Sequence, residues 1–194
     1  MVPLHDVRPD RQRIREHMGR IEEHMDSAGR IALGPGHYAL GRGHMTLESW
    51  NEARHHLEAA WEANYREPEV ALALGRVMGA LYDEELQQTA QIDSEEVREA
   101  RRARIREMYL DPAVDYLRLG RDAEMESPEL VAGILALYER RYEDALNSAR
   151  TASASTPWLY EARLLEGDVH RILAIEQQER GEYPNAQRSY EQAK

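Results

Sequence analysis

Two pairs of glycines in this chain are separated by the same interval. The pairs are Gly41/Gly75 and Gly133/Gly167, each 34 residues apart. The first glycine of each pair is followed 12 residues later by an alanine, at Ala53 and Ala145. Small residues are needed where two helices cross closely, because a larger side chain would push the helices apart. The spacing therefore predicts a repeated unit of two packed helices.

Other positions recur in phase with the glycines. The first helix of each unit, helix A, carries an aromatic or similar residue, then Leu-Gly, then a second aromatic or similar residue. The second helix, helix B, carries small and apolar residues and is followed by proline. Its clearest match is His37, Leu40, Gly41, His44, Trp50, Ala53, Leu57, Ala60 and Pro68. This pattern resembles that of the tetratricopeptide-repeat (TPR) family over roughly residues 34–194. The resemblance implies an all-α fold, a right-handed α-solenoid of about four helix pairs that binds other proteins.

The second repeat is longer than the others. The alanine expected 12 residues after Gly75 is Ala113, 38 residues on, so 26 residues are extra. We expect a helical insertion at about 84–110. Its helix is predicted to begin at Asp93, with Glu96 three residues later as in a capping box.

Prolines mark three predicted boundaries. Pro112 and Pro128 each follow a polar residue, and both are expected to begin a new helix because proline is tolerated in the first turn. The segment Gly34–Gly36 is expected to break the chain before the first repeat.

Residues 1–33 are predicted to precede the array. Residues 1–9 are expected to be disordered, and a helix is predicted over about 10–28. Its apolar stripe has spacings of 4, 3 and 4, at Ile14, Met18, Ile21 and Met25. The helix either caps the first repeat or forms a coiled-coil link to an upstream domain.

The array is predicted to be truncated at its C-terminus. Lys194 follows the last signature alanine directly, whereas repeat arrays normally end in a polar capping helix. Tyr183, Ala186 and Tyr190 are therefore expected to be exposed, or to be buried by a second copy of the chain in a homodimer.

Composition narrows the function. The net charge of −11 argues against general nucleic-acid binding, which needs a basic face. No segment approaches the ~20 apolar residues of a membrane span, and no secretion signal is visible at the start. The absence of cysteine excludes thiolate metal sites and fits a reducing cytoplasm.

The sequence offers little for catalysis. None of the eight histidines has the i, i+4 spacing of a helical metal pair, and His37 and His44 occupy packing positions of the repeat. Lys194 is the only lysine, so no internal lysine can bind ATP or form a Schiff base. We therefore predict no catalytic residue, no metal and no cofactor.

The predicted binding site is the concave groove. The resemblance implies that it is lined by helix A at positions around the signature glycine. By register these are Tyr38, Arg42, Leu72, Arg76, Leu130, Ile134, Tyr138, Leu164, Asp168 and Arg171. Some relatives clamp a C-terminal carboxylate with Lys and Asn at such positions; neither residue type occurs there in this chain, so that activity is not implied.

An apolar floor flanked by arginines suits a peptide that carries an acidic or phosphorylated residue. Arg42 and Arg76 are 34 residues apart, so they belong to neighbouring repeats. The alternative for the apolar residues is packing between neighbouring helices. The alternative function is a small-molecule sensor that uses the same groove.

Three stretches also resemble the repeat region that follows the catalytic domain in some bacterial serine/threonine protein kinases. They are GPGHYALGRG, HLEAAWEANYREPEVALALGRVMGALY and TPWLYEARLLEGDVH. This resemblance implies a non-catalytic module of a larger signalling protein. The kinase motifs themselves are absent, so no kinase activity is implied for this chain.

Overall fold

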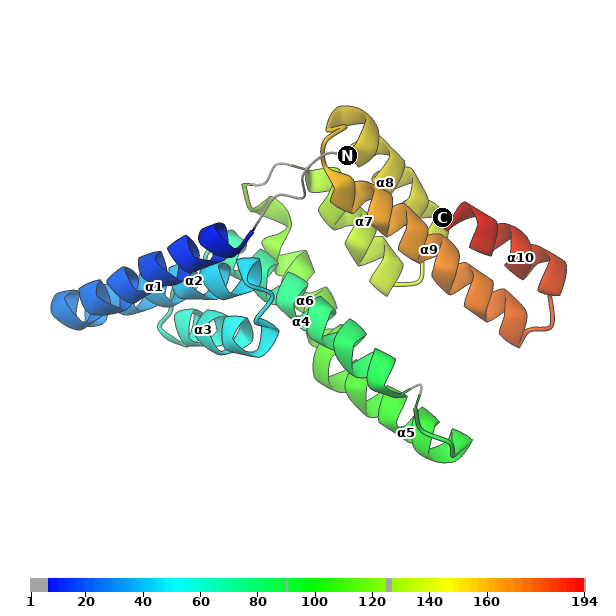
Figure 1. The fold of residues 1–194 in the computed structure, drawn as a ribbon, viewed down its shortest axis with the longest axis horizontal. Helices are drawn as coiled ribbons and strands as arrows, with labels where there is room; N and C mark the ends of the chain where they lie inside the picture. Colours follow the sequence, from blue (N-terminus) through cyan, green and yellow to red (C-terminus); the bar gives the residue numbers. More distant parts are fainter. Residues whose placement is uncertain (1–6, 90, 125–126, 194) are drawn as a thin grey trace. The chain divides into compact units, whose positions relative to one another are not determined.

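The computed structural model describes residues 7–89, 91–124 and 127–193 (Figure 1). Every regular element in these residues is helical and none is a strand, so the predicted all-α class is confirmed. The chain divides into two compact units, Met1–Ala123 (unit 1) and Glu124–Lys194 (unit 2). Among all the described residues, no helix is both long enough and apolar enough to cross a membrane.

The helices of unit 1 pack against one another in order along the chain. They are α1 (Arg8–Ala28), α2 (Arg30–Thr46), α3 (Trp50–Glu62), α4 (Pro68–Thr89), α5 (Glu95–Ile105), the π-helical η1 (Arg106–Leu110), α6 (Asp111–Leu119) and the 3₁₀-helical η2 (Gly120–Asp122). α1 packs on α2, α2 on α3, α3 on α4, and α4 on α6.

α1 packs along α2 through methionines that lie over glycines. A Cβ atom on Gly43 would be 2.7 Å from Sδ of Met18, and Gly36 makes the same kind of contact with Met25. Both methionines are buried. The predicted apolar stripe of α1 therefore faces α2. The disorder predicted for residues 1–9 is wrong for residues 8 and 9, because the helix begins at Arg8. Residues 1–6 lie outside the described residues.

The predicted chain break at Gly34–Gly36 is wrong. α2 begins directly after Gly29, whose φ is +67°, and runs on through this segment with Pro35 inside the helix. The proline lies early in the helix and removes one backbone N–H. The two glycines beside it are buried, the first against Tyr65. They provide close packing and leave the helix unbroken.

The signature glycines of unit 1 make the same contact twice. A Cβ on Gly41 would lie 2.6 Å from Cγ of Leu57, and one on Gly75 would lie 2.7 Å from Cγ of Leu117. Both leucines are fully buried. The backbone oxygen of Ala53 lies 3.4 Å from the same point at Gly41. The prediction that these glycines lie at close helix contacts is confirmed.

Residues 84–89 and 95–110 of the predicted insertion are helical and lengthen one hairpin (Figure 1). α4 continues to Thr89, and the helix that begins at Glu95 runs through η1 into α6. In η1 the N–H of Asp111 donates to the carbonyl of Arg106, which makes the wide turn of a π-helix. α6 begins at Asp111 with Pro112 in its first turn, as predicted, but it follows η1 directly and without a loop.

Serine caps begin two helices. The hydroxyl of Ser94 accepts from the N–H of Val97 at 3.4 Å, so α5 begins one residue later than a cap at Asp93 would place it. The hydroxyl of Ser127 accepts from the N–H of Leu130 at 3.3 Å. The predicted start of a helix at Pro128 is confirmed.

Unit 2 consists of helices that also pack in order. They are α7 (Pro128–Tyr138), α8 (Tyr142–Ser155), α9 (Tyr160–Glu179) and α10 (Tyr183–Gln192). α7 packs on α8, α8 on α9, and α9 on α10. The core is lined by buried residues of α7, α8 and α9, including three alanines one turn apart on α8. A Cβ on Gly133 would lie 2.7 Å from Cδ2 of Leu165, which belongs to α9.

Candidate functional site

Four of the predicted groove residues lie in unit 1. Tyr38 and Arg42 are one turn apart on α2, and Leu72 and Arg76 are one turn apart on α4. The two helices are in contact. Each arginine directly follows one of the glycines that make equivalent helix contacts. The two arginines therefore occupy the same position in two successive hairpins.

Neither of these arginines is paired with a carboxylate of the described residues. Arg42 is exposed; its Nη1 donates to the hydroxyl of Tyr38 at 2.9 Å, and its guanidinium lies 5.8 Å from the centre of that ring. Arg76 is exposed and makes no hydrogen bond or ion pair with another described residue. By contrast, Arg102 of α5 donates to Glu99 at 2.8 Å. We call the surface that carries Tyr38 and Arg42 of α2 and Leu72 and Arg76 of α4 the α2–α4 face. Its two arginines are thus available to an anion.

The apolar part of this face is narrow. Leu72 is half-buried where α4 meets η2, and a Cβ on Gly120 would lie 2.5 Å from its backbone nitrogen. Tyr38 is also half-buried, with its ring centre 6.0 Å from that of Tyr65. Both side chains pack within unit 1, as the packing alternative predicts, and expose only part of their surface.

Six predicted groove residues lie in unit 2. They are Leu130, Ile134 and Tyr138 of α7, and Leu164, Asp168 and Arg171 of α9. Leu130 is buried in the core of unit 2, and Ile134 packs against that core. Asp168 accepts from Arg171 at 3.1 Å, so this arginine is paired within its own helix. Leu164 is 58% exposed. The structure brings Leu130 and Ile134 to the core, leaves Tyr138 half-buried, and leaves the α9 residues at the surface.

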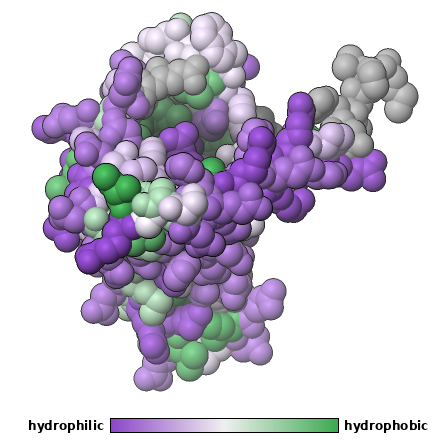
Figure 2. Space-filling view, turned by 90° about the vertical axis from the view of Figure 1, so that its left-hand side faces the viewer, coloured by the Kyte–Doolittle hydropathy of each residue, from purple (hydrophilic) through white to green (hydrophobic). Residues whose placement is uncertain are grey.

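α9 exposes two apolar residues that the sequence prediction missed. Tyr160 and Ile175 are exposed, and they lie in line with Leu164 along one stripe of the helix. With Asp168 and Arg171 the spacings along this stripe are 4, 4, 3 and 4. This helical spacing is visible in the sequence and could have predicted the exposed stripe of α9. Elsewhere, the face shown in Figure 2 is mostly hydrophilic, with apolar side chains in small separate patches.

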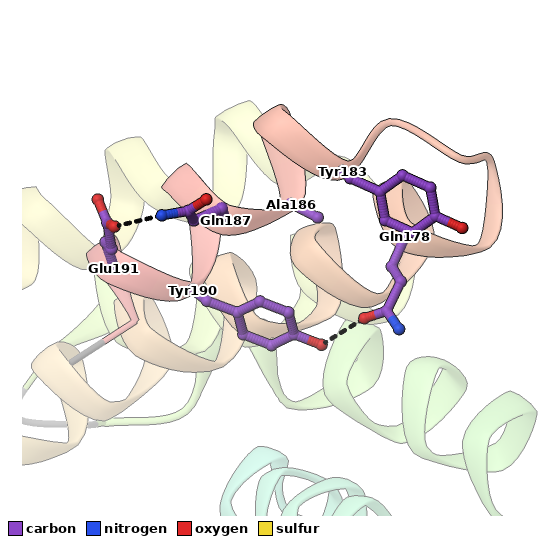
Figure 3. A pocket seen from close by; sticks show the side chains of 6 residues that line it. All are labelled: Gln178, Tyr183, Ala186, Gln187, Tyr190 and Glu191. Carbon is purple, nitrogen blue, oxygen red and sulfur yellow. Dashed lines mark hydrogen bonds between the residues drawn. The ribbon is translucent and has the colours of Figure 1, made fainter.

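A shallow hollow lies between α9 and α10 (Figure 3). It has a volume of about 500 Å³ and is lined by Gln178, Tyr183, Ala186, Gln187, Tyr190 and Glu191. Tyr183 is 68% and Tyr190 38% exposed, so the predicted exposure of these two tyrosines is confirmed. The hydroxyl of Tyr190 donates to Oε1 of Gln178 at 3.4 Å. The predicted exposure of Ala186 is wrong, because this small residue is buried.

Four histidine rings meet between α2 and α3. His37 and His44 come from α2, and His55 and His56 from α3. Nδ1 of His37 and Nδ1 of His56 are 3.0 Å apart, so one nitrogen donates to the other. The His44 ring stacks on the His56 ring at 5.2 Å between centres and an angle of 13°. The His55 ring meets His56 edge-on at 5.4 Å.

From the sequence, His37 and His44 were predicted to be packing residues of the repeat, and no contact with His55 or His56 was predicted. The contact of Gly41 with the backbone of Ala53 fixes which residues of α2 and α3 lie opposite one another. Because α2 and α3 run antiparallel, His37, one turn before the glycine, lies opposite residues one turn after the alanine, where His56 is found. The crossing predicted from the sequence therefore implied the cluster.

Two histidines of the cluster, His37 and His56, are shifted toward the neutral form. Burial, followed by the charges of His44, His37 and His55, lowers the pKa of His56 to about 4. Burial and His55 also lower the pKa of His37. Nδ1 of His44 is buried and has no hydrogen-bond partner among the described residues.

Unit 2 contains a polar contact of the opposite kind, which depends on charge. Glu176 of α9 accepts from the hydroxyl of Tyr142 at 2.6 Å and also pairs with Arg140. Burial raises the pKa of Glu176, but the hydrogen bonds from Tyr142 and Arg140 outweigh this effect and lower it. The contact ties the start of α8 to the end of α9.

Over the described part of the chain, no group of three or more His, Cys, Asp or Glu side chains is arranged to hold a metal ion. The features that remain are a face with two available arginines, an exposed apolar stripe, a shallow hollow and a histidine cluster. No protein-family model matches this chain, and comparison with curated proteins gives no match either.

Proposed function

We propose that this chain is a protein-interaction module of the TPR type, which binds an acidic or phosphorylated peptide segment on the α2–α4 face of unit 1. The observation that carries the proposal is the pair Arg42 and Arg76. They are exposed, lie at equivalent positions of two hairpins, and have no carboxylate partner among the described residues.

The repeat assignment is supported by packing. Consecutive helices form hairpins, and the close contact at Gly41 recurs at Gly75 with an equivalent leucine. A right-handed solenoid of about four such pairs accounts for both observations. The α9 stripe, with Tyr160, Leu164 and Ile175, supplies a second exposed helix face in unit 2.

The charge of the ligand follows from the charge of the chain. The protein carries a net charge of −11, so an acidic segment is repelled by most of its surface. An unpaired guanidinium binds carboxylate or phosphate through two parallel N–H donors, which gives a local attraction with defined geometry. Binding at Arg42 and Arg76 would thus be selective for a segment that places its anions correctly.

The biological setting is part of the proposal. The resemblance to kinase-associated repeats favours a non-catalytic module of a larger bacterial signalling protein in the cytoplasm. A small-molecule sensor is the second candidate. The hollow between α9 and α10, lined by two exposed tyrosines, is the observation that favours it. A rise in melting temperature with a metabolite and with no peptide would support the sensor.

The test compares two double variants of equal charge change against an array of acidic and phosphorylated peptides. Arg42→Glu with Arg76→Glu should weaken the best peptide at least tenfold, about 1.4 kcal/mol. Arg15→Glu with Arg104→Glu changes two other exposed arginines of unit 1 and should have little effect. Undiminished binding by the folded first variant, or an equal loss in both, would overturn the α2–α4 face as the site.

A further inference from the structure

The histidine cluster combines four basic side chains, and no carboxylate of the described residues contributes to the pKa shift of His56. The groups whose charges act on His56 are His37 and His44 of α2 and His55 of α3. No group of α1 or α4, the other helices packed on this hairpin, contributes. A proton on His56 therefore meets three other histidines and no stabilising carboxylate of the described residues.

The close packing of the histidine rings opposes protonation of more than one of them. The 3.0 Å contact between His37 and His56 needs one nitrogen with hydrogen and one without. Protonation of both rings would place two N–H donors against each other and two like charges at a ring separation of 5.3 Å. A charge on His44 would be stacked on His56. The packed arrangement therefore disfavours a second proton on the His37–His56 pair.

We infer that the cluster is an acid-sensitive latch between α2 and α3, which holds the hairpin closed when its histidines are neutral and loosens it when they are protonated. This inference stands apart from the proposed peptide binding. It concerns the packing of unit 1 and holds whether or not the α2–α4 face binds a ligand.

The direction of the pH effect follows from linkage. In the unfolded chain histidines titrate near their ordinary pKa of 6.5, whereas in the folded chain His56 and His37 titrate lower. As the pH falls below 6.5 the unfolded state takes up protons first, so the folded state loses stability. The loss grows until the pH passes the folded pKa values. Each excess proton lowers the folding equilibrium constant tenfold per pH unit.

The chain carries its own reporters for this test. Its three tryptophans are Trp50 and Trp61, at the two ends of α3, and Trp158 in unit 2. In a Trp158→Phe background, tryptophan fluorescence reports on α3 alone. Acidification from pH 7 to pH 4.5 should shift the emission to the red and lower the folding equilibrium constant of unit 1 by about tenfold or more.

Three proteins are compared in that background: the parent, His56→Asn, and the control His24→Asn, which removes an exposed histidine of α1. The amide of asparagine can replace the bond to His37 but does not titrate. The shift should be much reduced in His56→Asn and unchanged in His24→Asn. Equal shifts in the parent and His56→Asn would overturn the latch.

Should His56→Asn fail to fold at pH 7.5, His56→Phe serves in its place, since it keeps a planar ring without a titrating nitrogen. A measurement on the unmutated chain completes the test. Nuclear magnetic resonance titration of the histidine ring protons should give His56 a pKa below about 5, well under the ordinary value. A pKa of 6.5 or higher for His56 would contradict the inference.

Discussion

Unit 1 and unit 2 use the same signature glycine in different surroundings. In unit 1, Gly41 and Gly75 each lie against a buried leucine at an equivalent repeat position. In unit 2 that position is Ala149, and Gly133 lies instead against Leu165 of α9. The repeated glycine therefore marks a close helix contact, whereas the side chain that fills the contact can come from a different helix.

The two units also differ in the polar groups that join their helices. Unit 1 joins α2 to α3 through the contact between the His37 and His56 rings, and unit 2 joins α8 to α9 through an ion pair around Glu176. One contact is weakened by gaining charge and the other by losing it. Both should lose stability in acid, but unit 1 should do so at a higher pH.

The largest expected effect separates the two glycine environments. Gly75→Leu should destabilise unit 1 by about 3–5 kcal/mol, because its Cβ would meet both the side chain and the backbone nitrogen of Leu117, the latter at 2.9 Å. Gly133→Leu should cost about 2–4 kcal/mol, because the nearest atom is the movable end of Leu165. Urea unfolding followed by circular dichroism measures both. A larger cost for Gly133→Leu would reverse the comparison.

The next effect concerns two carboxylates of α9. Glu176→Gln should cost about 1–2 kcal/mol, since it removes a charge from a half-buried network. Asp168→Asn should cost less than about 0.5 kcal/mol, because its pair with Arg171 is exposed. The same urea unfolding at pH 7 compares them; equal costs would show that the network adds nothing beyond a surface pair.

The stability cost of Glu176→Gln should depend on pH because the pKa of Glu176 is lowered in the folded chain. Its contribution is present above its unfolded pKa of about 4.5 and is lost as the pH falls through the folded value. The difference between Glu176→Gln and the parent should therefore shrink below pH 4.5. A difference that persists at pH 3 would point to a packing effect of the substitution.

The smallest effect tests whether glycine in unit 1 serves contact or flexibility. Gly34→Ala should cost about 1 kcal/mol, because a Cβ would lie 2.5 Å from Cβ of Tyr65. Gly19→Ala in α1 should instead stabilise by about 0.5–1 kcal/mol, because nothing lies within 4 Å and alanine favours the helix. Thermal melts resolve both signs. Stabilisation by Gly34→Ala would show that its close packing is not needed.

The periodicity of the sequence predicted much of the fold. The 34-residue interval predicted helical hairpins with glycines at their contacts, and unit 1 shows that contact at Gly41 and Gly75. The errors arose where a local signal competed with tertiary packing. Pro35 is a helix breaker by propensity, but α2 continues through it. Pro112 lies at the start of α6 as predicted, but no spacing in the sequence marks the π-helical turn that precedes it.

The site was less predictable than the fold. Register placed Arg42 and Arg76 at the surface, because a charged side chain without a partner is seldom buried. The same register placed Leu130 in a groove, although an apolar residue at that position can equally face the core, where it lies. The histidine cluster required pairing of two helices residue by residue, which composition and spacing within one helix do not supply.

The central claim is that Arg42 and Arg76 present one anion-binding face on α2 and α4. Arginine Nε–H signals report on each guanidinium, so the direct measurement is a titration of ¹⁵N-labelled protein with a glutamate-rich peptide and with its phosphoserine counterpart. The account predicts that the signals of Arg42 and Arg76 shift together, at one peptide concentration, while that of Arg104 does not. Shifts confined to the arginines of α5, or no shift at Arg76, would contradict it.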